Sequence, residues 1–308
     1  MSAPGPSRGR VRAVVTGGAG FVGGHLVDRL ISDGLDVLVV DDLSTGSTSN
    51  IPATARFERC DVADADLERL FRDWRPRIVY HLAAQASVPR SMADPLHDLT
   101  VNVVGTHRVA TATREAGAAR LVFVSSGGAV YGETVRPATE RSLPAPRSHY
   151  GVHKLAAEGH VALAGLPYAI ARPSNIYGPR QQPGLEGAVV AAFLDQARRA
   201  GRLTIHGDGS QTRDFIHVDD VVEALSRLGD VTGSTGVWNV SSGRRTSVVE
   251  LASVVERVVG VPLVRTMAER RPGDVTDSAI SSGTLRRMGW RPRMGLEAGI
   301  RSSIPGAA

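Results

Sequence analysis

The chain has 308 residues and a formal net charge of +5, with 42% hydrophobic and 22% charged residues. These proportions are ordinary for a globular protein. No apolar run approaches the roughly 20 residues that a membrane-spanning helix needs. The single cysteine, Cys60, excludes an intrachain disulfide and a cysteine-rich metal site. The start lacks the pattern of a signal peptide, so we expect a cytoplasmic protein. The sequence contains no basic stripe interleaved with aromatic residues, so it gives no indication of nucleic-acid binding.

The first element is a strand over residues 13–16, followed by a glycine turn and a helix with Val22, Leu26 and Leu30 on one face. The turn contains three glycines spaced three apart: Gly17, Gly20 and Gly23. In this context they allow the turn, the approach of a pyrophosphate and the packing of the helix on the sheet. The next strand, residues 37–41, ends in Asp41, where a carboxylate accepts hydrogen bonds from ribose hydroxyls. This region therefore predicts a dinucleotide site.

Strands and helices continue to alternate. The patterns predict a polar loop over 42–50, strands over 57–60, 78–82 and 121–126, and helices over 64–74 and 101–116. Such alternation favours an α/β fold, a Rossmann-type doubly wound parallel sheet. Beyond Pro173, prolines and glycines interrupt the pattern, which suits a smaller C-terminal substrate-binding domain. We expect a dinucleotide-binding domain over 9–172 with a return segment over 214–241, and a substrate-binding domain over 173–213 and 242–308.

Tyr150 and Lys154 are four residues apart, which places both on one face of a helix. A lysine ammonium beside a phenol stabilises the phenolate and lowers the tyrosine pKa from about 10. Such a tyrosine can exchange a proton with a substrate hydroxyl near neutral pH. The same spacing also occurs by chance on helix surfaces. Here it is a stronger indication of an acid–base pair, because it follows a nucleotide-binding half.

Two histidines, His149 and His153, bracket Tyr150 with the spacing of metal ligands on a helix. No third ligand is evident nearby, so we expect no metal. Three further histidines lie in apolar settings typical of packed or surface residues: His25, His81 and His217.

A series of motifs resembles the extended short-chain dehydrogenases/reductases of the nucleotide-sugar epimerase/dehydratase group, closest to galactose epimerase-like members. The motifs are TGGAGFVG (16–23), DDLSTG (41–46), HLAAQASV (81–88), VSSGGAVYG (124–132), YGVHK (150–154), RPSNIYGPRQ (172–181), GDGSQTRDFIHVDD (207–220), WNVSSG (238–243) and RPGDV (271–275). They cover nearly the whole chain in order, and together they are very specific.

The resemblance implies roles for individual residues. Tyr150 would be the base, and Lys154 would also bond the nicotinamide ribose of NAD. The remaining cofactor contacts would come from Gly17, Gly20, Phe21, Val22, Gly23, Asp41, Asp42, Asp61, Val62, Leu82, Ala83, Ala84 and Ser125. Asp41 should repel a 2′-phosphate and so favour NAD over NADP. The nucleotide-diphosphate sugar would be bound by Ser87, Ser126, Asn175, Arg213, Arg271 and Asp274. For Arg213 and Arg271, an ordinary salt bridge with Asp214 or Asp274 is the alternative.

The chain departs from the family pattern at the catalytic hydroxyl. The family's Ser or Thr commonly lies four residues before the tyrosine of the VYG motif, where this chain has Gly127. Either Ser126 or Ser125 must take its role, and we favour Ser126. Ile280 also replaces an Asp of the family's C-terminal segment, and Asp42 stands where many relatives have Asn.

The resemblance implies oxidation of the sugar at carbon 4. A 4,6-dehydratase of this family carries Asp-Glu directly after the catalytic Thr, where this chain has Gly127, Gly128 and Ala129. Epimerisation needs only the Ser–Tyr–Lys set. We therefore predict an NAD-dependent nucleotide-sugar 4-epimerase, acting on a UDP-hexose as a homodimer. The alternatives are another nucleotide-sugar modifier (a uronate 4-epimerase, decarboxylase or 4,6-dehydratase) and a non-catalytic NAD-binding regulator.

Overall fold

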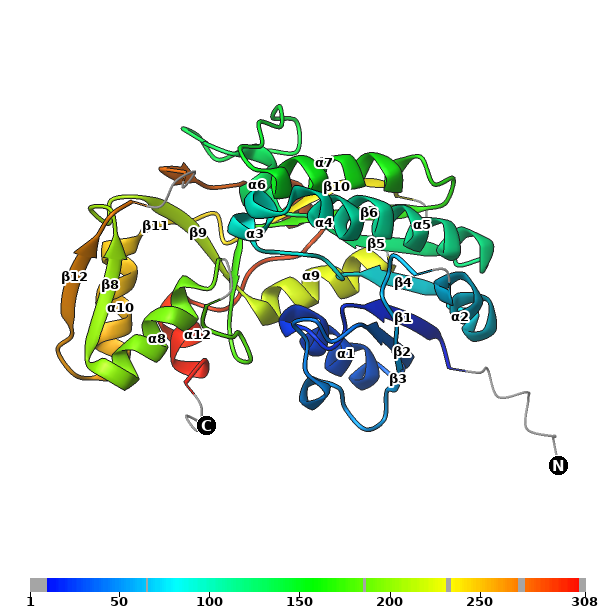
Figure 1. The fold of residues 1–308 in the computed structure, drawn as a ribbon, viewed down its shortest axis with the longest axis horizontal. Helices are drawn as coiled ribbons and strands as arrows, with labels where there is room; N and C mark the ends of the chain where they lie inside the picture. Colours follow the sequence, from blue (N-terminus) through cyan, green and yellow to red (C-terminus); the bar gives the residue numbers. More distant parts are fainter. Residues whose placement is uncertain (1–9, 65, 185–186, 231–233, 271–274, 305–308) are drawn as a thin grey trace.

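A seven-stranded parallel sheet dominates the computed structural model, which describes residues 10–64, 66–184, 187–230, 234–270 and 275–304 (Figure 1). The strand order is β10-β6-β5-β4-β1-β2-β3. The strands are β1 (Arg12–Thr16), β2 (Asp36–Asp41), β3 (Arg56–Arg59), β4 (Ile78–His81), β5 (Arg120–Val124), β6 (Tyr168–Pro173) and β10 (Gly236–Val240). The order reverses at β1, as in a doubly wound sheet. The predicted fold class is confirmed.

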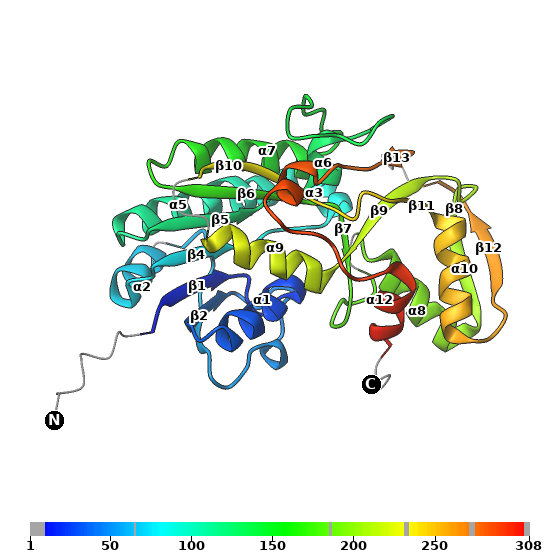
Figure 2. The same cartoon turned by 180° about the vertical axis from the view of Figure 1, so that it is seen from behind.

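Helices cover both faces of this sheet, as Figures 1 and 2 show from opposite sides. One face carries α1 (Phe21–Ser32) and α9 (Val218–Asp230), and the other carries α2 (Asp66–Trp74), α5 (Gly105–Glu115) and α7 (His149–Ala162). The alternation of strand side chains produces the two cores, since Val15 packs toward α1 while Val14 packs toward α5. Each fully buried side chain of this kind stabilises the fold by about 1.5–3 kcal/mol.

The chain is already helical well before residue 101, where we expected the helix that became α5. It forms α3 (Val88–Ala93), α4 (Pro95–Leu99) and a π-helical turn, η2 (Thr100–Val104), before α5 begins. The side chains of Ser87 and Asp94 cap α3 and α4. Each of these two helices also has a proline in its first turn, where no amide donor is needed. These caps and prolines mark the start of the helical segment, which the periodicity of apolar residues alone did not reveal.

A second, smaller group of elements follows β6. Its four-stranded sheet contains β7 (Asn175–Tyr177), β9 (Thr212–His217), β11 (Arg245–Ser247) and β13 (Asp277–Ser278), and β8 (Arg202–His206) pairs with β12 (Val264–Ala268). Its helices are α8 (Val189–Ala200), α10 (Val248–Val259) and α12 (Leu296–Ser302), whereas α11 (Gly283–Arg287) packs against β10 of the large sheet. Phe193 of α8 and Leu251 of α10 belong to its core. Strand β9 spans the boundary that we expected between residues 213 and 214.

Asp214 of β9 joins two of the places where the chain passes between the large and the small sheet. Its buried carboxylate accepts hydrogen bonds from Ser174, just after β6, and from Ser242 and Gly243, just after β10. Burial raises the pKa of Asp214 to about 6. These donors are hydroxyl groups and backbone amides, so the alternative salt bridge between Asp214 and Arg213 is not among the contacts of this carboxylate.

Among the described helices, none is long and apolar enough to cross a membrane.

Candidate active site

The glycine turn between β1 and α1 leaves no room for side chains. Gly17 has a φ of +71°, and a Cβ at this position would stand 2.5 Å from the amide nitrogen of Ala83. A Cβ on Gly23 would collide with the Gly17 carbonyl oxygen. Gly20 caps α1 without a side chain, so the first-turn amides, starting at Phe21 and Val22, have no acceptor within the helix. This end of α1 therefore fits a diphosphate.

Asp41 lies beside this turn, at the end of β2. Its carboxylate accepts hydrogen bonds from the amides of Ala19 (3.0 Å) and Leu43 (2.8 Å). Burial raises the pKa of Asp41, and these two bonds oppose that effect. A carboxylate has about four acceptor sites, so Asp41 retains capacity for ribose hydroxyls. The neighbouring Asp42 instead closes its own loop by bonding Ser44.

Asp61 and Val62 follow the end of β3, next to β2. The amide of Cys60 donates to the carbonyl of Asp41, which joins the two strand ends. Asp61 accepts the amide of Ala63, whereas Val62 is buried in the core that includes α5. The structure thus brings Asp61 close to Asp41 and gives Val62 a packing role.

His81 fixes the stretch that contains Leu82, Ala83 and Ala84. Thr106 donates its hydroxyl to the carbonyl of Asn102, so it accepts from His81 Nε2, and His81 Nδ1 accepts from Thr16 Oγ1. His81 is therefore neutral. Burial lowers its pKa to about 3. This residue is a packed histidine, and it holds the ends of β1 and β4 together beside the glycine turn.

The two candidate hydroxyls of the site have different partners. Strand β5 ends at Val124, so the predicted strand through residue 126 was too long. Ser125 donates its hydroxyl to Glu158 at 2.5 Å and is buried. Ser126 caps α6 (Gly127–Tyr131), and its side chain is hydrogen-bonded to Tyr150.

Tyr150 and Lys154 lie one turn apart on α7, as predicted. Burial raises the pKa of Tyr150 to about 12, and the hydrogen bond with Ser126 opposes this effect. The predicted net lowering of the Tyr150 pKa is thus wrong for this structure, because burial outweighs the effects that favour the phenolate. Burial lowers the pKa of Lys154 to about 8, and its ammonium lies 4.5 Å from the centre of the Phe123 ring.

A buried charge network that the sequence reading missed supports these residues. Arg172 bonds Glu158 through two nitrogens and also donates to the hydroxyl of Tyr131, which donates to Asn239. Glu158 lies one turn after Lys154 on α7 and raises the lysine pKa. The only sequence signal was the Lys–Glu spacing of four residues. The network ties β6, β10 and α6 to the helix that carries Tyr150.

The residues predicted to bind substrate lie only partly together. Asn175, at the start of β7, and Ser278 of β13 both approach the position where a Cβ on Gly128 would stand, at 3.8 and 3.6 Å. Arg213 pairs with Ser278 in register, and its guanidinium donates to the carbonyl of Thr212. Ser87 caps α3. Arg271 and Asp274 lie outside the described residues.

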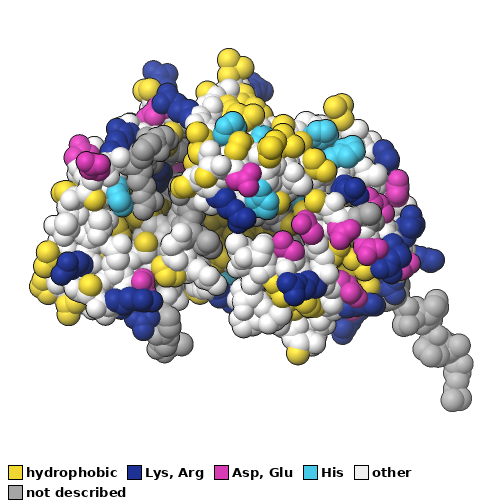
Figure 3. All heavy atoms as spheres, viewed as in Figure 1, with side chains coloured by type: hydrophobic (Ala, Val, Ile, Leu, Met, Phe, Trp, Pro, Cys, Tyr) yellow, Lys and Arg dark blue, Asp and Glu magenta, His cyan; other side chains and the backbone are white. Residues whose placement is uncertain are grey.

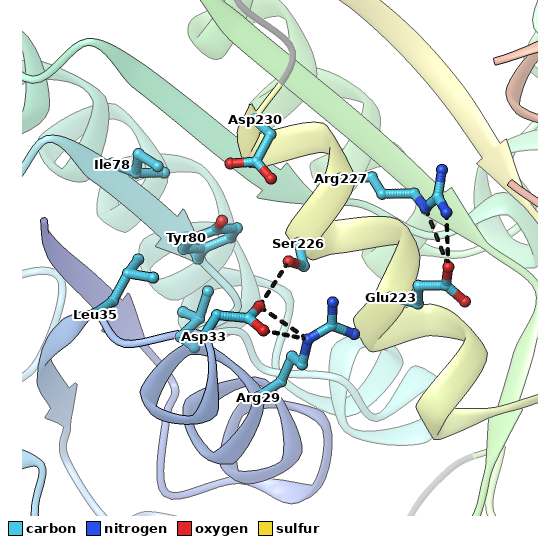
Figure 4. A pocket seen from close by; sticks show the side chains of 10 residues that line it. Arg29, Asp33, Leu35, Ile78, Tyr80, Glu223, Ser226, Arg227 and Asp230 are labelled. Carbon is cyan, nitrogen blue, oxygen red and sulfur yellow. Dashed lines mark hydrogen bonds and ion pairs between the residues drawn. The ribbon is translucent and has the colours of Figure 1, made fainter. Parts of the chain in front are cut away.

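A separate cavity lies away from these residues. It has a volume of about 400 Å³ and lies between α1 and α9, near the C-terminal ends of both helices (Figure 4). Four of its charged side chains form two pairs, Arg29 with Asp33 and Arg227 with Glu223. Among the described residues, no cluster of three or more His, Cys, Asp or Glu side chains is arranged to hold a metal ion.

Comparison with known proteins decides the family. Residues 13–241 match the NAD dependent epimerase/dehydratase family. The chain belongs to this family. It is 42% identical over 306 residues to a UDP-glucose 4-epimerase of Mycolicibacterium smegmatis, an alignment that covers 96% of this chain and 97% of the relative.

Solved structures agree with this assignment. The structure of a UDP-glucose 4-epimerase of Thermus thermophilus in complex with NAD superposes with a TM-score of 0.91 at 38% identity, covering 95% of this chain and 97% of that chain. The UDP-glucose 4-epimerase of Thermotoga maritima with UDP-glucose gives the same values. The predicted family, enzyme class and NAD cofactor are thereby confirmed.

Proposed function

We propose that this family member is a 4-epimerase that interconverts UDP-hexoses. The observation that carries the proposal is the group formed by Ser126, Tyr150 and Lys154 at the carboxyl end of β5, beside a turn that fits NAD. The relatives named UDP-glucose 4-epimerases support the choice of a UDP-sugar. We propose UDP-glucose and UDP-galactose as the pair.

In the proposed mechanism, Tyr150 takes the proton of the sugar 4-hydroxyl. Ser126 donates a hydrogen bond to the same oxygen, which becomes a carbonyl oxygen. The Lys154 ammonium favours the phenolate form of Tyr150. When bound, NAD supplies the acceptor and the donor of the hydride at sugar carbon 4. Return of the proton from Tyr150 after the sugar has turned completes the epimerisation.

The residues that follow Ser126 favour epimerisation over dehydration. Gly127, Gly128 and Ala129 carry no group that can move a proton, whereas removal of water from carbons 5 and 6 needs an acid and a base. Among the described residues, Asn175 and Arg213 are the candidates to hold the substrate diphosphate, since a guanidinium matches phosphate oxygens. We propose the same role for Arg271, next to Asp274, and a substrate contact for Ser87.

Turnover of a panel of nucleotide sugars tests this function. UDP-glucose, UDP-galactose, UDP-glucuronate, dTDP-glucose and GDP-mannose are incubated with the purified protein, and the products are separated and identified by NMR. We expect interconversion of the two UDP-hexoses and a loss of about 10²–10⁴-fold in Tyr150→Phe. Products that have lost water or carbon dioxide would support a dehydratase or decarboxylase. NAD binding without any turnover would support a regulator.

We further propose a homodimer that pairs through α3, α4, η2 and α7. This face exposes large apolar side chains, including Leu96 (75% exposed), Met92 (56%) and Val152 (47%). Figure 3 shows hydrophobic and histidine side chains gathered in the upper part of the view, over these elements. Light scattering should give twice the chain mass, and Leu96→Glu should give the monomer. A monomeric wild type would contradict the dimer.

We propose that the large sheet with its helices binds the cofactor and that the smaller group of elements binds the substrate. The assignment of substrate binding to the smaller group is supported by the positions of Asn175 and Arg213, which belong to β7 and β9 of the smaller sheet. We also propose a cytoplasmic location, for which the single cysteine is the support.

A further inference from the structure

Asp98 of α4 is a completely buried carboxylate close to the proposed catalytic residues. Its Oδ1 accepts hydrogen bonds from the side-chain amides of Gln85 (2.6 Å) and Asn102 (3.1 Å). Its Oδ2 is 2.6 Å from Nδ1 of His153. All three neighbours can donate, so both oxygens of the Asp98 side chain accept hydrogen bonds. A buried charge of this kind is costly unless it is paired.

His153 is the partner that can balance this charge. Within the described parts of the chain, it is the one basic side chain within ion-pair distance of Asp98. Its side chain is 10% exposed, and it lies on α7 between Tyr150 and Lys154. The pair therefore links α4 to the helix that carries both proposed acid–base residues.

Two other sets of contacts hold the surroundings of this pair in place. The amide of Tyr150 donates to the hydroxyl of Ser91, on α3. The backbone of Gln85, which directly follows the stretch beside the glycine turn, bonds the side chain of Asn102 through both its amide and its carbonyl. A change in charge at Asp98 would thus act on a site whose geometry is held independently.

We propose that His153 is a positioning residue whose positive charge balances Asp98 and thereby sets the pH range in which Tyr150 and Lys154 exchange protons. The inference rests on the proposed function, because it takes Tyr150 and Lys154 as the acid–base pair. It assigns to a histidine outside the Ser–Tyr–Lys set a role that acts through charge rather than through contact with substrate.

The electrostatics of the site support this role. Asp98 raises the pKa of both Tyr150 and Lys154. An Asp98 carboxylate without its counter-charge would therefore raise both pKa values further. The other titratable or charged groups on the elements around Asp98 and the pair include Arg90 of α3, His97 of α4, His81 of β4, Arg172 of β6, and His149 and Glu158 of α7. Arg172 is already bonded to Glu158, and His81 is neutral, so neither replaces His153 as the partner of Asp98.

The pH dependence of kcat/KM, measured with UDP-glucose or UDP-galactose, tests the proposal. His153→Asn keeps a hydrogen-bond donor but removes the charge. We expect its acid limb to move up by about one pH unit, the size of one charge acting over roughly 10 Å at an effective dielectric constant near 20. Asp98→Asn removes the carboxylate and with it the need for a charged partner. The acid limb of the kcat/KM profile of this variant should therefore stay near that of the wild type. The double variant should restore the wild-type limb.

Controls separate charge from folding and from the proposed function. His149→Asn removes an exposed histidine one turn earlier on the same helix and should leave the profile unchanged. Circular dichroism and NAD binding check folding, and His153→Gln replaces His153→Asn if the latter does not fold. An unmoved limb in His153→Asn, together with a downward shift in Asp98→Asn, would overturn the proposal, because it would mean that His153 is neutral. A Tyr150→Phe variant with near-wild-type turnover would instead overturn the proposed function.

Discussion

Ile280 occupies the space that a side chain at position 127 would need. A Cβ on Gly127 would stand 2.5 Å from Cδ1 of Ile280 and 3.2 Å from the carbonyl oxygens of Arg172 and Pro173. Gly127 and Ile280 are both departures from the family pattern, and the structure shows that they are complementary. Ile280 packs with Tyr131 and Ala138 in a small buried cluster. The hydroxyl that the family places at 127 has no room here, which supports the proposal that Ser126 takes this role.

Gly127→Ser should therefore destabilise the protein. Overpacking of a tight core costs about 1–3 kcal/mol, and urea unfolding should show this loss. Ile280→Val in addition to Gly127→Ser should recover part of it, with a coupling energy of about 0.5–3 kcal/mol. Gly128→Ser is the matched control, since its Cβ would meet only ordinary contacts at 3.6 and 3.8 Å. Equal losses at 127 and 128 would contradict the steric account.

Replacement of each serine should separate catalysis from stability. Ser126→Ala removes the hydrogen-bond partner of Tyr150, and we expect a loss of about 10²–10⁴-fold in turnover at saturating substrate. Ser125→Ala removes a donor to the buried Glu158, and we expect a loss of about 1.5–3 kcal/mol in unfolding free energy with turnover largely kept. A large loss of turnover confined to Ser125→Ala would reverse the assignment.

Asp41 should determine the preference for NAD. Its carboxylate is fixed by two backbone amides, so a 2′-phosphate would meet a negative charge that cannot turn away. Titration of cofactor-free wild-type protein should give tighter binding of NAD than of NADP. Asp41→Asn should bind NAD more weakly and discriminate less, because it loses the charge and one acceptor. Equal or tighter binding of NADP by the wild type would contradict this role.

His81 should make the protein less stable in acid. Its folded pKa of about 3 lies below the ordinary value of 6.5, so the unfolded chain binds the extra proton between these values. The stability that the neutral ring contributes is present above pH 6.5 and is lost as the pH falls toward 3. From pH 7 to pH 5, this amounts to about 2 kcal/mol. Urea unfolding at both pH values should show a smaller difference in His81→Asn, whereas the exposed control His160→Asn should resemble the wild type.

The sequence predicted the large sheet because its strands and helices alternate with strong apolar patterns. It also predicted the cofactor turn, since Gly17, Gly20 and Asp41 have spacings that depend on local geometry alone. The helix that begins at Val88 was missed because its signals are caps and prolines rather than periodicity. The strand through Ser126 was extended too far because an apolar run does not reveal where a helix cap begins.

The tyrosine pKa could not be predicted from spacing. The distance of four residues places Tyr150 and Lys154 on one face, but burial of the phenol depends on elements far away in the sequence. The partners of Asp98 and Glu158 likewise come from separate helices and strands. Charge networks of this type are fixed by tertiary packing, so residues such as His153 and Arg172 carry no local signal of their roles.

The position of Asp214 also limits how the molecule can move. Its carboxylate holds residue 174 and residues 242 and 243 together, so these two crossings cannot separate without leaving a buried charge unpaired. One buried carboxylate therefore couples the two crossings, so that loosening one of them would also loosen the other.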